Sequence, residues 1–137
     1  MADTTFSIRC IGHLESELRS MDDAPRQGDE GAPDAWLIID EAYAPALQGV
    51  ASGDELILVT WLHLADRTVL QTYPRNDRSR PMTGVFATRS PDRPNPLGLH
   101  RVNVREITSH RVRIGPLEAI DGTPVVDVKI VLNLDER

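Results

Sequence analysis

The chain consists largely of short apolar segments in which every second residue is polar. Phe6, Ile8 and Cys10 alternate with polar neighbours near the start, and the same alternation returns at residues 102–105 and 111–114. A period of two places the apolar side chains on one face of a strand, so these segments predict half-buried strands. Many short strands without alternating helices predict an antiparallel or mixed β-barrel rather than a doubly wound sheet.

Three further segments complete the expected strands. Residues 35–40 form a short apolar run, and residues 54–66 (DELILVTWLHLAD) are apolar on both faces, as in a central strand. Asp121-Gly122 is a favourable turn pair before a closing strand. The inner face of that strand is expected to comprise Val126, Val128, Ile130 and Leu132. Only residues 13–20 and 44–51 suit helices, so the expected fold is mainly β, a small single-sheet barrel with one or two short helices.

The length of the chain predicts one domain. Its 137 residues are enough to bury about two thirds of the unfolded surface in a single core, so we expect one domain over residues 1–137. Cys10 is the only cysteine and has no partner for an internal disulfide. The first residues do not resemble a secretory signal, and the longest apolar run is far shorter than the roughly 20 residues of a membrane span. We therefore expect a soluble cytoplasmic protein without a membrane partner.

Charge is distributed unevenly along the chain. The formal net charge of −6 argues against general affinity for nucleic acids, which comes mainly from basic side chains that neutralise phosphates. Residues 74–96 nevertheless carry a local net charge of +3, because they contain five arginines and two aspartates. A genome rich in arginine codons would explain the number of arginines in the chain, but not this cluster.

Several familiar catalytic and binding motifs are absent from the sequence. It contains no GxGxxG, GxxxxGK[ST], HExxH or GxSxG motif, so no ordinary nucleotide-binding fold or hydrolase is indicated. The four histidines lack metal-ligand spacing, and no metal site is predicted.

The stretch GVFATRSPDRPNPLGLHRV, residues 84–102, predicts a rigid polar loop. Each of its three prolines fixes its own φ and disfavours the helical region for the residue before it, so Ser90, Arg93 and Asn95 are expected to be extended. Such rigidity suits a loop that holds Arg89, Arg93 and Asn95 in place for a ligand.

Three other segments have both a functional and a structural interpretation. The loop around APRQG, residues 24–28, is a disordered acidic surface loop unless it belongs to a site. His63, inside an otherwise apolar strand, is either a buried neutral histidine bonded to a neighbour or a polar group that lines a pocket. Residues 115–127 are a simple hairpin unless they too belong to a site.

Five blocks of the sequence match, in order, the motifs of one known family. GVFATRSPDRPNPLGL is similar to a loop that reads close to GVFATRSPxRPNPIG. FSIRCIGHLES is similar to an opening strand, APRQG to a PRQ loop, LILVTWLH to a central strand ending in histidine, and EAIDGTPVVDVK to a DGTPVLDIK segment. These motifs resemble those of the TsaA-like, or TrmO (YaeB), family, and they cover nearly the whole chain.

This resemblance implies an S-adenosylmethionine-dependent methyltransferase built on a small β-barrel. It also implies a homodimer with the cofactor near the subunit interface. The best-known members methylate threonylcarbamoyladenosine beside the anticodon of a threonine tRNA, so tRNA is the implied partner.

The resemblance further implies a set of site residues. The PRQ loop maps onto Pro25, Arg26, Gln27 and Gly28. The segment before DGTP, where the family's backbone meets adenosine, maps onto Gly115, Pro116, Leu117 and Glu118. His63, Arg89 and Leu99 complete the implied cofactor residues, and the implied catalytic residues are His63, Arg89, Arg93 and Asn95.

These side chains suit methyl transfer from a sulfonium, in which the protein mainly aligns nucleophile, methyl and sulfur away from water. Arg89 and Arg93 offer forked donors to a carboxylate of the cofactor or of the substrate's threonyl group. Asn95 can pair with an amide or a base edge. If the acceptor nitrogen must lose a proton, His63 is the family-matched residue able to take it.

The sequence departs from the family at three points. DVK continues into IVLNLDER where the family usually has KPYxPY, and Asp92 stands where an aromatic or aliphatic residue is common. The C-terminal domain with which longer members engage tRNA has no expected counterpart. Two other functions therefore stay open: a methyltransferase that acts on a small metabolite, and a non-catalytic sensor that binds the cofactor and signals through its dimer.

Overall fold

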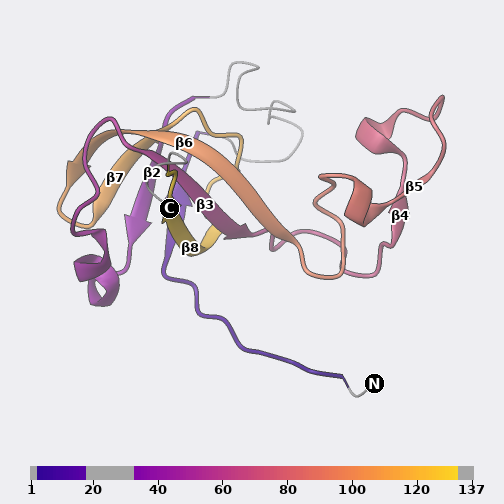
Figure 1. Ribbon diagram of the computed structural model, residues 1–137, viewed down its shortest axis with the longest axis horizontal. Coiled ribbons are helices and arrows are strands. Elements are labelled where there is room, and N and C mark those ends of the chain that lie inside the picture. Colours follow the sequence, from indigo (N-terminus) through magenta and orange to yellow (C-terminus); the bar gives the residue numbers. More distant parts are fainter. Residues whose placement is uncertain (1–2, 18–32, 133–137) are drawn as a thin grey trace.

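The computed structural model describes residues 3–17 and 33–132 and shows a closed six-stranded β-barrel (Figure 1). Around the barrel the strands follow the order β1-β2-β7-β6-β3-β8, and every neighbouring pair is antiparallel. The strands span Gly12–Glu15 (β1), Ala35–Ile39 (β2), Glu55–Trp61 (β3), Leu97–Thr108 (β6), Arg111–Gly115 (β7) and Pro124–Ile130 (β8). The expected mainly β, single-sheet barrel is confirmed.

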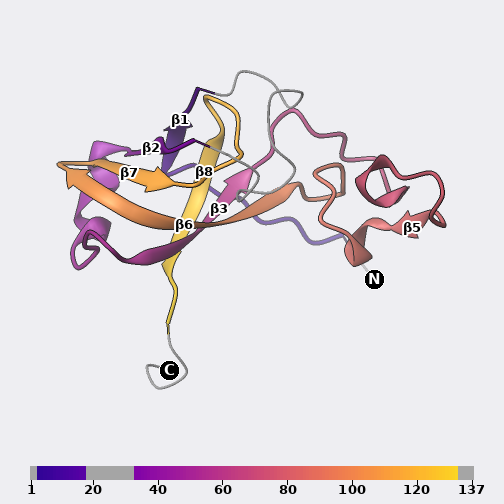
Figure 2. The ribbon, with the colours of Figure 1, turned by 90° about the horizontal axis from the view of Figure 1, so that it is seen from above.

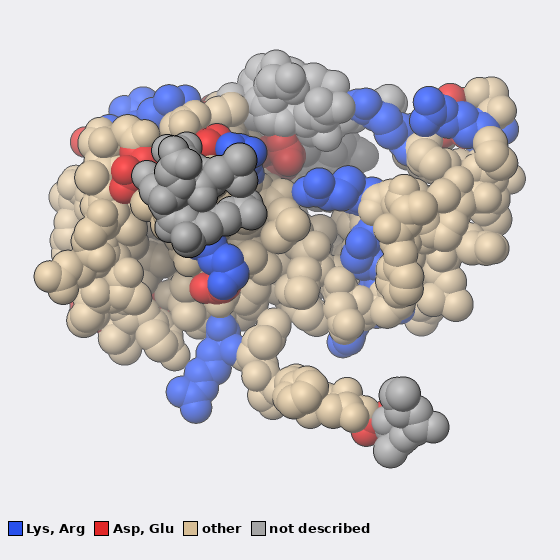
Figure 3. Space-filling view, viewed as in Figure 1, with Lys and Arg blue, Asp and Glu red and all other residues tan. Residues whose placement is uncertain are grey.

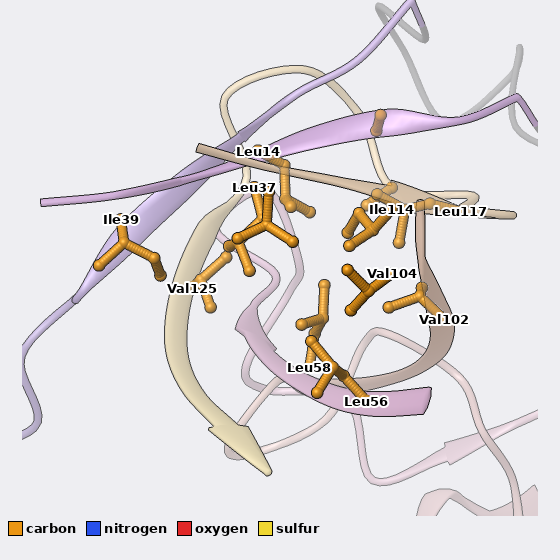
Figure 4. Close-up of a cluster of buried hydrophobic side chains, with 13 residues drawn as sticks. Leu14, Leu37, Ile39, Leu56, Leu58, Val102, Val104, Ile114, Leu117 and Val125 are labelled. Atoms are coloured by element: carbon orange, nitrogen blue, oxygen red, sulfur yellow. The ribbon is translucent and has the colours of Figure 1, made fainter. Parts of the chain in front are cut away.

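The barrel interior is filled by aliphatic side chains that alternate along the strands. In β3, Leu56 and Leu58 are fully buried, whereas Ile57 between them is only half-buried. The facing side chains come from the other strands (Figure 4), and those that are fully buried include Leu14, Leu37, Val102, Val112, Ile114 and Val125. Burial of one such side chain contributes about 1.5–3 kcal/mol, so a one-residue slip that turned it outward would be costly.

One end of the barrel is covered by the segment between β7 and β8, residues 116–123. Because β7 and β8 are not neighbours in the sheet, their connection has to cross the barrel. Leu117 is 1% exposed and belongs to the core, and its N–H donates to the carbonyl oxygen of Pro33 at 3.1 Å. Gly122, with a φ of 84°, forms the turn that the Asp121-Gly122 pair predicted.

Residues 62–96 form a lobe that projects from the barrel between β3 and β6 (Figures 1 and 2). The pairing of Trp61 with Leu97 and a 2.8 Å hydrogen bond from the N–H of Leu62 to the carbonyl oxygen of Pro96 close its base. Its elements are β4 (Gln71–Thr72), η2 (Pro74–Asn76), β5 (Thr83–Gly84) and η3 (Val85–Ala87), where η denotes a 3₁₀ helix. The arginine-proline stretch forms the last part of this lobe and leads into β6.

The N-terminal part of the described chain differs from what the sequence predicts. Residues 6–10 pair with no strand of the described chain, and β1 begins only at Gly12. The helix expected over residues 13–20 is wrong in its described part, because β1 includes His13, Leu14 and Glu15 and pairs with both β2 and β8. That pairing buries Leu14 completely.

The inner face of β8 also differs from the prediction. Val128 packs against the core as predicted, and Val125 is fully buried. Val126 is only half-buried, and Ile130 and Leu132 are 46% and 45% exposed. The register with β3 shifts between Val59 and Thr60, so that Val126 is an extra residue in β8. Such a bulge reverses the inward and outward alternation on either side of it.

Two smaller predictions need adjustment. The short helix expected over residues 44–51 is a 3₁₀ helix, η1, over Glu41–Leu47. β3 ends at Trp61 rather than continuing to residue 66, because the chain turns there into the lobe. No helix in the described ranges is long and apolar enough to cross a membrane.

Candidate functional site

Arg93 holds the arginine-proline stretch together from within. Its Nε donates to the carbonyl oxygen of Ser90 at 2.8 Å, and its Nη2 donates to the carbonyl oxygens of Val85 and Thr88 at 2.6 and 2.7 Å. The residue is half-buried. Because a guanidinium presents its donors in a fixed fork, one side chain can satisfy three carbonyls of a tight loop. The sequence predicts this loop to be rigid, and Arg93 is part of the reason for its rigidity.

Arg89, four residues earlier, has almost no partner in the structure. It is exposed, and its only hydrogen bond within the described residues is a long one of 3.4 Å from Nη2 to the carbonyl oxygen of Leu99 in β6. Leu99 itself is 52% exposed on the outer face of the barrel. The structure therefore brings Arg89 and Leu99 together and leaves a forked cation beside an exposed apolar side chain.

Asn95 lies close to an arginine that the sequence does not single out. Nη2 of Arg67 donates to Oδ1 of Asn95 at 3.1 Å, and Nε of Arg67 donates to the carbonyl oxygen of Pro94 at 2.7 Å. The guanidinium of Arg67 also lies 5.1 Å from the ring centroid of Trp61. These contacts join the start of the lobe to its end. No local pattern in the sequence could reveal them, because the partners are almost thirty positions apart.

His63 is neither inside a strand nor buried. It lies exposed in the turn that follows β3, and within the described ranges its side chain has no hydrogen bond or ion pair. The interpretation of His63 as a buried, bonded histidine of the strand is therefore wrong. In the described residues, no hydrogen bond or ion pair joins it to Arg89, Arg93 or Asn95.

The segment Gly115 to Glu118 combines buried backbone with one accessible carboxylate. Gly115 is buried and packs so closely against the carboxylate of Asp34 that a Cβ at this position would collide with it. Leu117 points into the core, as Figure 4 shows, while the side chain of Glu118 remains 30% exposed. Ala119, the next residue, is 5% exposed, so the segment is anchored on both sides of Glu118.

Glu118 faces His100, a second residue that the sequence does not single out. Oε1 of Glu118 lies 3.6 Å from Nδ1 of His100, and Nε2 of His100 is hydrogen-bonded to Oγ1 of Thr60 at 2.8 Å. The alternating pattern of β6 could have indicated that His100 points inward with Val102 and Val104. Its polar partners come from other strands and loops and leave no local signal.

Two carboxylates of the lobe are held ionised by their own turns. Hydrogen bonds from Thr68 lower the pKa of Asp66, with the side-chain bond as the larger cause, and hydrogen bonds from Ser79 lower the pKa of Asp77 in the same way. These carboxylates offset part of the positive charge of the lobe arginines at neutral pH.

Residues Pro25, Arg26, Gln27 and Gly28 of the predicted PRQ loop lie outside the described residues. A surface hollow of about 880 Å³ lies next to the residues that flank them, between β1, β2 and the 121–122 turn. A second hollow, of about 660 Å³, lies on the lobe and is lined by residues 74–77 and Arg80. Neither hollow includes Arg89, Leu99 or Glu118, so the candidate site is an open surface in this structure.

Comparisons with known proteins agree with this architecture. The sequence profile of the tRNA-methyltransferase O N-terminal domain matches residues 13–135. A probable S-adenosyl-L-methionine-binding protein of Methanothermobacter thermautotrophicus is 38% identical over 129 residues, which cover 94% of this chain and 92% of that protein. The tRNA (adenine(37)-N6)-methyltransferase of Escherichia coli is 30% identical, over 97% of this chain and 60% of that enzyme.

A solved structure shows the same likeness. The crystal structure of TrmO from Pseudomonas aeruginosa matches with a TM-score of 0.76 and 27% identity, over 94% of this chain and 57% of that one. The chain therefore corresponds to nearly all of one relative and to little more than half of the two longer proteins. Since the profile covers most of the chain and the relatives share its fold and sequence, this protein belongs to the tRNA-methyltransferase O N-terminal domain family.

Proposed function

We propose that the protein binds S-adenosylmethionine where the arginine-proline stretch meets β6, and that it transfers the cofactor's methyl group to N6 of threonylcarbamoyladenosine in tRNA. The observation that carries the proposal is the contrast between Arg93 and Arg89. Arg93 uses its donors to brace the loop, whereas the fork of Arg89 is exposed and has one long contact. A braced loop that presents an exposed guanidinium suits recognition of a carboxylate.

The residues of the candidate site fit the chemical groups of this cofactor. S-adenosylmethionine carries a carboxylate, a flat apolar base, hydroxyls and an ammonium, and when bound it supplies a methyl group on a sulfonium. Arg89 would hold the carboxylate, the exposed Leu99 would contact the base, and the carboxylate of Glu118 would accept hydrogen bonds from hydroxyl or ammonium groups. Arg93 and Asn95 would keep the loop in place, and His63 would take a proton from the acceptor nitrogen.

Calorimetric titration of S-adenosylmethionine into the wild type and into Arg89→Ala tests the proposed cofactor binding. We expect binding that this substitution weakens at least tenfold, a loss of about 1.4 kcal/mol. Arg105→Ala is the matched control, because Arg105 is also exposed but lies on the barrel and pairs with Asp34 at 3.4 Å. Equal losses in both variants, or no binding by folded wild type, would refute this site.

The charges of the lobe support RNA as the acceptor. The barrel arginines have carboxylate partners at 2.7–3.4 Å, namely Arg101, Arg105, Arg111 and Arg113. In the described chain, Arg67, Arg78 and Arg89 of the lobe have no carboxylate within ion-pair distance, and Arg80 lies 3.8 Å from Asp77. Figure 3 shows basic side chains on the lobe and where it meets the barrel. Cations not neutralised by their own protein are available for phosphates.

Binding and methylation assays test whether tRNA is the methyl acceptor. The double variant Arg78→Ala/Arg80→Ala is expected to weaken tRNA binding and to reduce its salt dependence. The control variant Arg101→Ala/Arg105→Ala, which removes two ion-paired barrel arginines, is expected to change neither. Wild type with labelled cofactor should transfer label to tRNA that carries threonylcarbamoyladenosine and lacks the methyl group. Label in a small metabolite only would select the metabolite alternative.

A cytoplasmic location follows from the tRNA substrate.

A non-catalytic cofactor sensor is the second candidate. The relative from Methanothermobacter thermautotrophicus, which has nearly the same extent as this chain, is named for cofactor binding and not for methyl transfer. Tight binding of S-adenosylmethionine without transfer to tRNA or to any tested metabolite would favour this alternative over the enzyme.

We also infer that two copies of the chain associate through the N-terminal arm, residues 3–10, which is exposed throughout. Phe6 and Ile8 in this arm are 84% and 57% exposed, and Leu97 and Leu99 are 43% and 52% exposed on β6. Apolar side chains on an unpaired extended segment gain most by covering a second apolar surface. An arm that reaches a second copy would place the interface near Leu99 and the proposed cofactor site.

Sedimentation of point variants tests this arrangement. Phe6→Asp is expected to convert a dimer into a monomer, whereas Phe86→Asp is not. Phe86 is a matched control because it is 86% exposed but lies in the lobe. A monomeric wild type, or a dimer broken only by Phe86→Asp, would contradict the role of the arm.

A further inference from the structure

The described residues contain one buried side-chain polar atom without a hydrogen-bond partner, and this atom is Nδ1 of His100. His100 is 9% exposed and, with Thr60 and Thr123, is one of three buried polar residues in residues 3–17 and 33–132. Thr123 is satisfied by a 2.7 Å bond to the carbonyl oxygen of Ile120. An unpaired buried donor or acceptor costs about 1–3 kcal/mol, so the position of His100 calls for a physical explanation.

The ring of His100 is fixed from one side by β3. Its Nε2 is 2.8 Å from Oγ1 of Thr60, and the opposite residue in the register of Thr60 is Gly98. A Cβ on Gly98 would come within 2.5 Å of the Thr60 hydroxyl and 2.9 Å of Nε2, so the absence of a side chain there makes room for this hydrogen bond. Thr60, Gly98 and His100 therefore form one packed unit.

The other side of the ring faces the carboxylate of Glu118 at 3.6 Å, which is longer than a hydrogen bond. The charge of that carboxylate favours a hydrogen on Nδ1, because a lone pair there would point at a negative oxygen. Nε2 then has the lone pair and accepts the hydroxyl hydrogen of Thr60. The result is a chain of polar groups directed from Thr60 through His100 toward Glu118. Its last contact, between His100 and Glu118, is too long for a hydrogen bond.

Glu118 is well placed to close that contact. Its neighbours Leu117 and Ala119 are 1% and 5% exposed and fix the backbone, while its own side chain is 30% exposed. A shift of the carboxylate by roughly 1 Å toward His100 would bring the 3.6 Å contact to hydrogen-bond length. Polar contacts that are long in a free protein often tighten when the ligand binds.

We propose that His100 is a positioning residue that acts through Glu118. On ligand binding, the Nδ1–H of His100 donates to one carboxylate oxygen of Glu118 and fixes the carboxylate, whose other oxygen accepts a hydrogen bond from a hydroxyl or ammonium group of the ligand. This inference rests on the proposed function, in which S-adenosylmethionine supplies such groups. Thr60 holds the ring and never touches the ligand.

Nitrogen NMR of the histidine rings tests the first step without any ligand. In the free wild type, His100 should have its hydrogen on Nδ1, with its signals assigned by their loss in His100→Gln. Glu118→Gln should remove this preference, whereas Glu106→Gln, a change of an exposed glutamate on β6, should leave it intact. A hydrogen on Nε2 in the wild type would overturn the proposal.

Titration of S-adenosylmethionine tests the second step. The Nδ1 hydrogen signal should move downfield on binding, as expected for a shorter hydrogen bond. Glu118→Gln and His100→Gln should each weaken binding about tenfold, and the double variant should be little worse than either, because both remove the same interaction. Thr60→Val provides a second route if His100→Gln fails to fold, and it should weaken binding in the same direction.

The outcomes separate the two proposals. No binding by folded wild type overturns the proposed function. Binding that Arg89→Ala weakens but that none of Glu118→Gln, His100→Gln and Thr60→Val changes leaves the proposed function standing and overturns the positioning role. Additive losses in the double variant also overturn it, because they would mean that His100 and Glu118 act separately.

Discussion

Nη2 of Arg93 lies 2.6 Å from the carbonyl oxygen of Val85, so the arginine-proline stretch is closed by a side chain that binds its own loop. Val85 is 2% exposed and begins η3, which places this contact at the well-packed part of the lobe. The rigidity of the stretch therefore has two sources, its prolines and this guanidinium.

Arg93→Lys should lower the stability of the protein and also weaken cofactor binding. An ammonium has no planar fork and would keep at most part of the three carbonyl contacts, so the free energy of unfolding should fall by about 1–2 kcal/mol. Urea denaturation measures this loss. Arg89→Ala should leave the urea midpoint unchanged, and equal midpoints for Arg93→Lys and wild type would contradict the bracing role.

Gly98→Ala should destabilise the barrel because it inserts a methyl group between Thr60 and His100, with contacts of 2.5 and 2.9 Å. Overpacking of this kind costs about 1–3 kcal/mol. Gly84→Ala is the matched control, since the nearest heavy atom to its Cβ is 4.0 Å away. Thermal unfolding of both variants gives the comparison, and a Gly98→Ala variant as stable as Gly84→Ala would contradict the packing described.

Leu117→Ala should be among the most damaging substitutions in the segment that covers the barrel. Leu117 is 1% exposed, and removal of a buried leucine side chain costs about 2–5 kcal/mol. Leu70→Ala, at a residue 65% exposed in the lobe, should change stability little. Chemical denaturation distinguishes the two, and similar losses in both variants would mean that Leu117 does not anchor the segment.

The Glu55–Arg101 pair should contribute to stability only above the acid range. Arg101 donates to both carboxylate oxygens of Glu55, at 2.7 and 2.9 Å, and this hydrogen bonding lowers the pKa of Glu55 from its ordinary value. A lowered folded-state pKa stabilises the fold above the unfolded value and loses this effect as pH falls through the folded value. Wild type and Glu55→Gln should therefore differ slightly at pH 7 and converge in acid.

Thermal unfolding from pH 7 down to about pH 3 measures this convergence. The difference should be small throughout, because both partners are exposed. Glu41→Gln, at an exposed glutamate without an ion pair in the described chain, should follow the wild type at every pH. A Glu55→Gln difference that grows as the pH falls would reverse the sign of the expected linkage.

The barrel could be predicted from the sequence because its strands bury one face. Leu56 and Leu58 in β3, and Val102 and Val104 in β6, follow the period of two and are all buried. The prediction failed where a non-local feature changed the local pattern. The bulge at Val126 depends on pairing with β3. Leu14 lies in a strand rather than a helix because β1 pairs with β2 and β8.

The candidate site was predictable only where it lies in one stretch of sequence. Arg89, Arg93 and Asn95 stand together in a proline-rich loop, and the structure distinguishes a bracing Arg93 from an exposed Arg89. The contacts of Arg67 with Asn95 and of His100 with Thr60 and Glu118 join distant parts of the chain. Periodicity and composition describe neighbours in sequence, so they contain no information about such contacts.

The lobe has a consequence for how the chain folds. β3 and β6 are neighbours in the barrel, but residues 62–96 must be looped out before Trp61 can meet Leu97. The entropy of closing such a loop grows only slowly with its length, by about 0.6 kcal/mol for each doubling. The barrel can therefore tolerate a longer or shorter lobe at little thermodynamic cost. A longer lobe should instead slow folding, because the β3–β6 pairing forms only after that loop has closed.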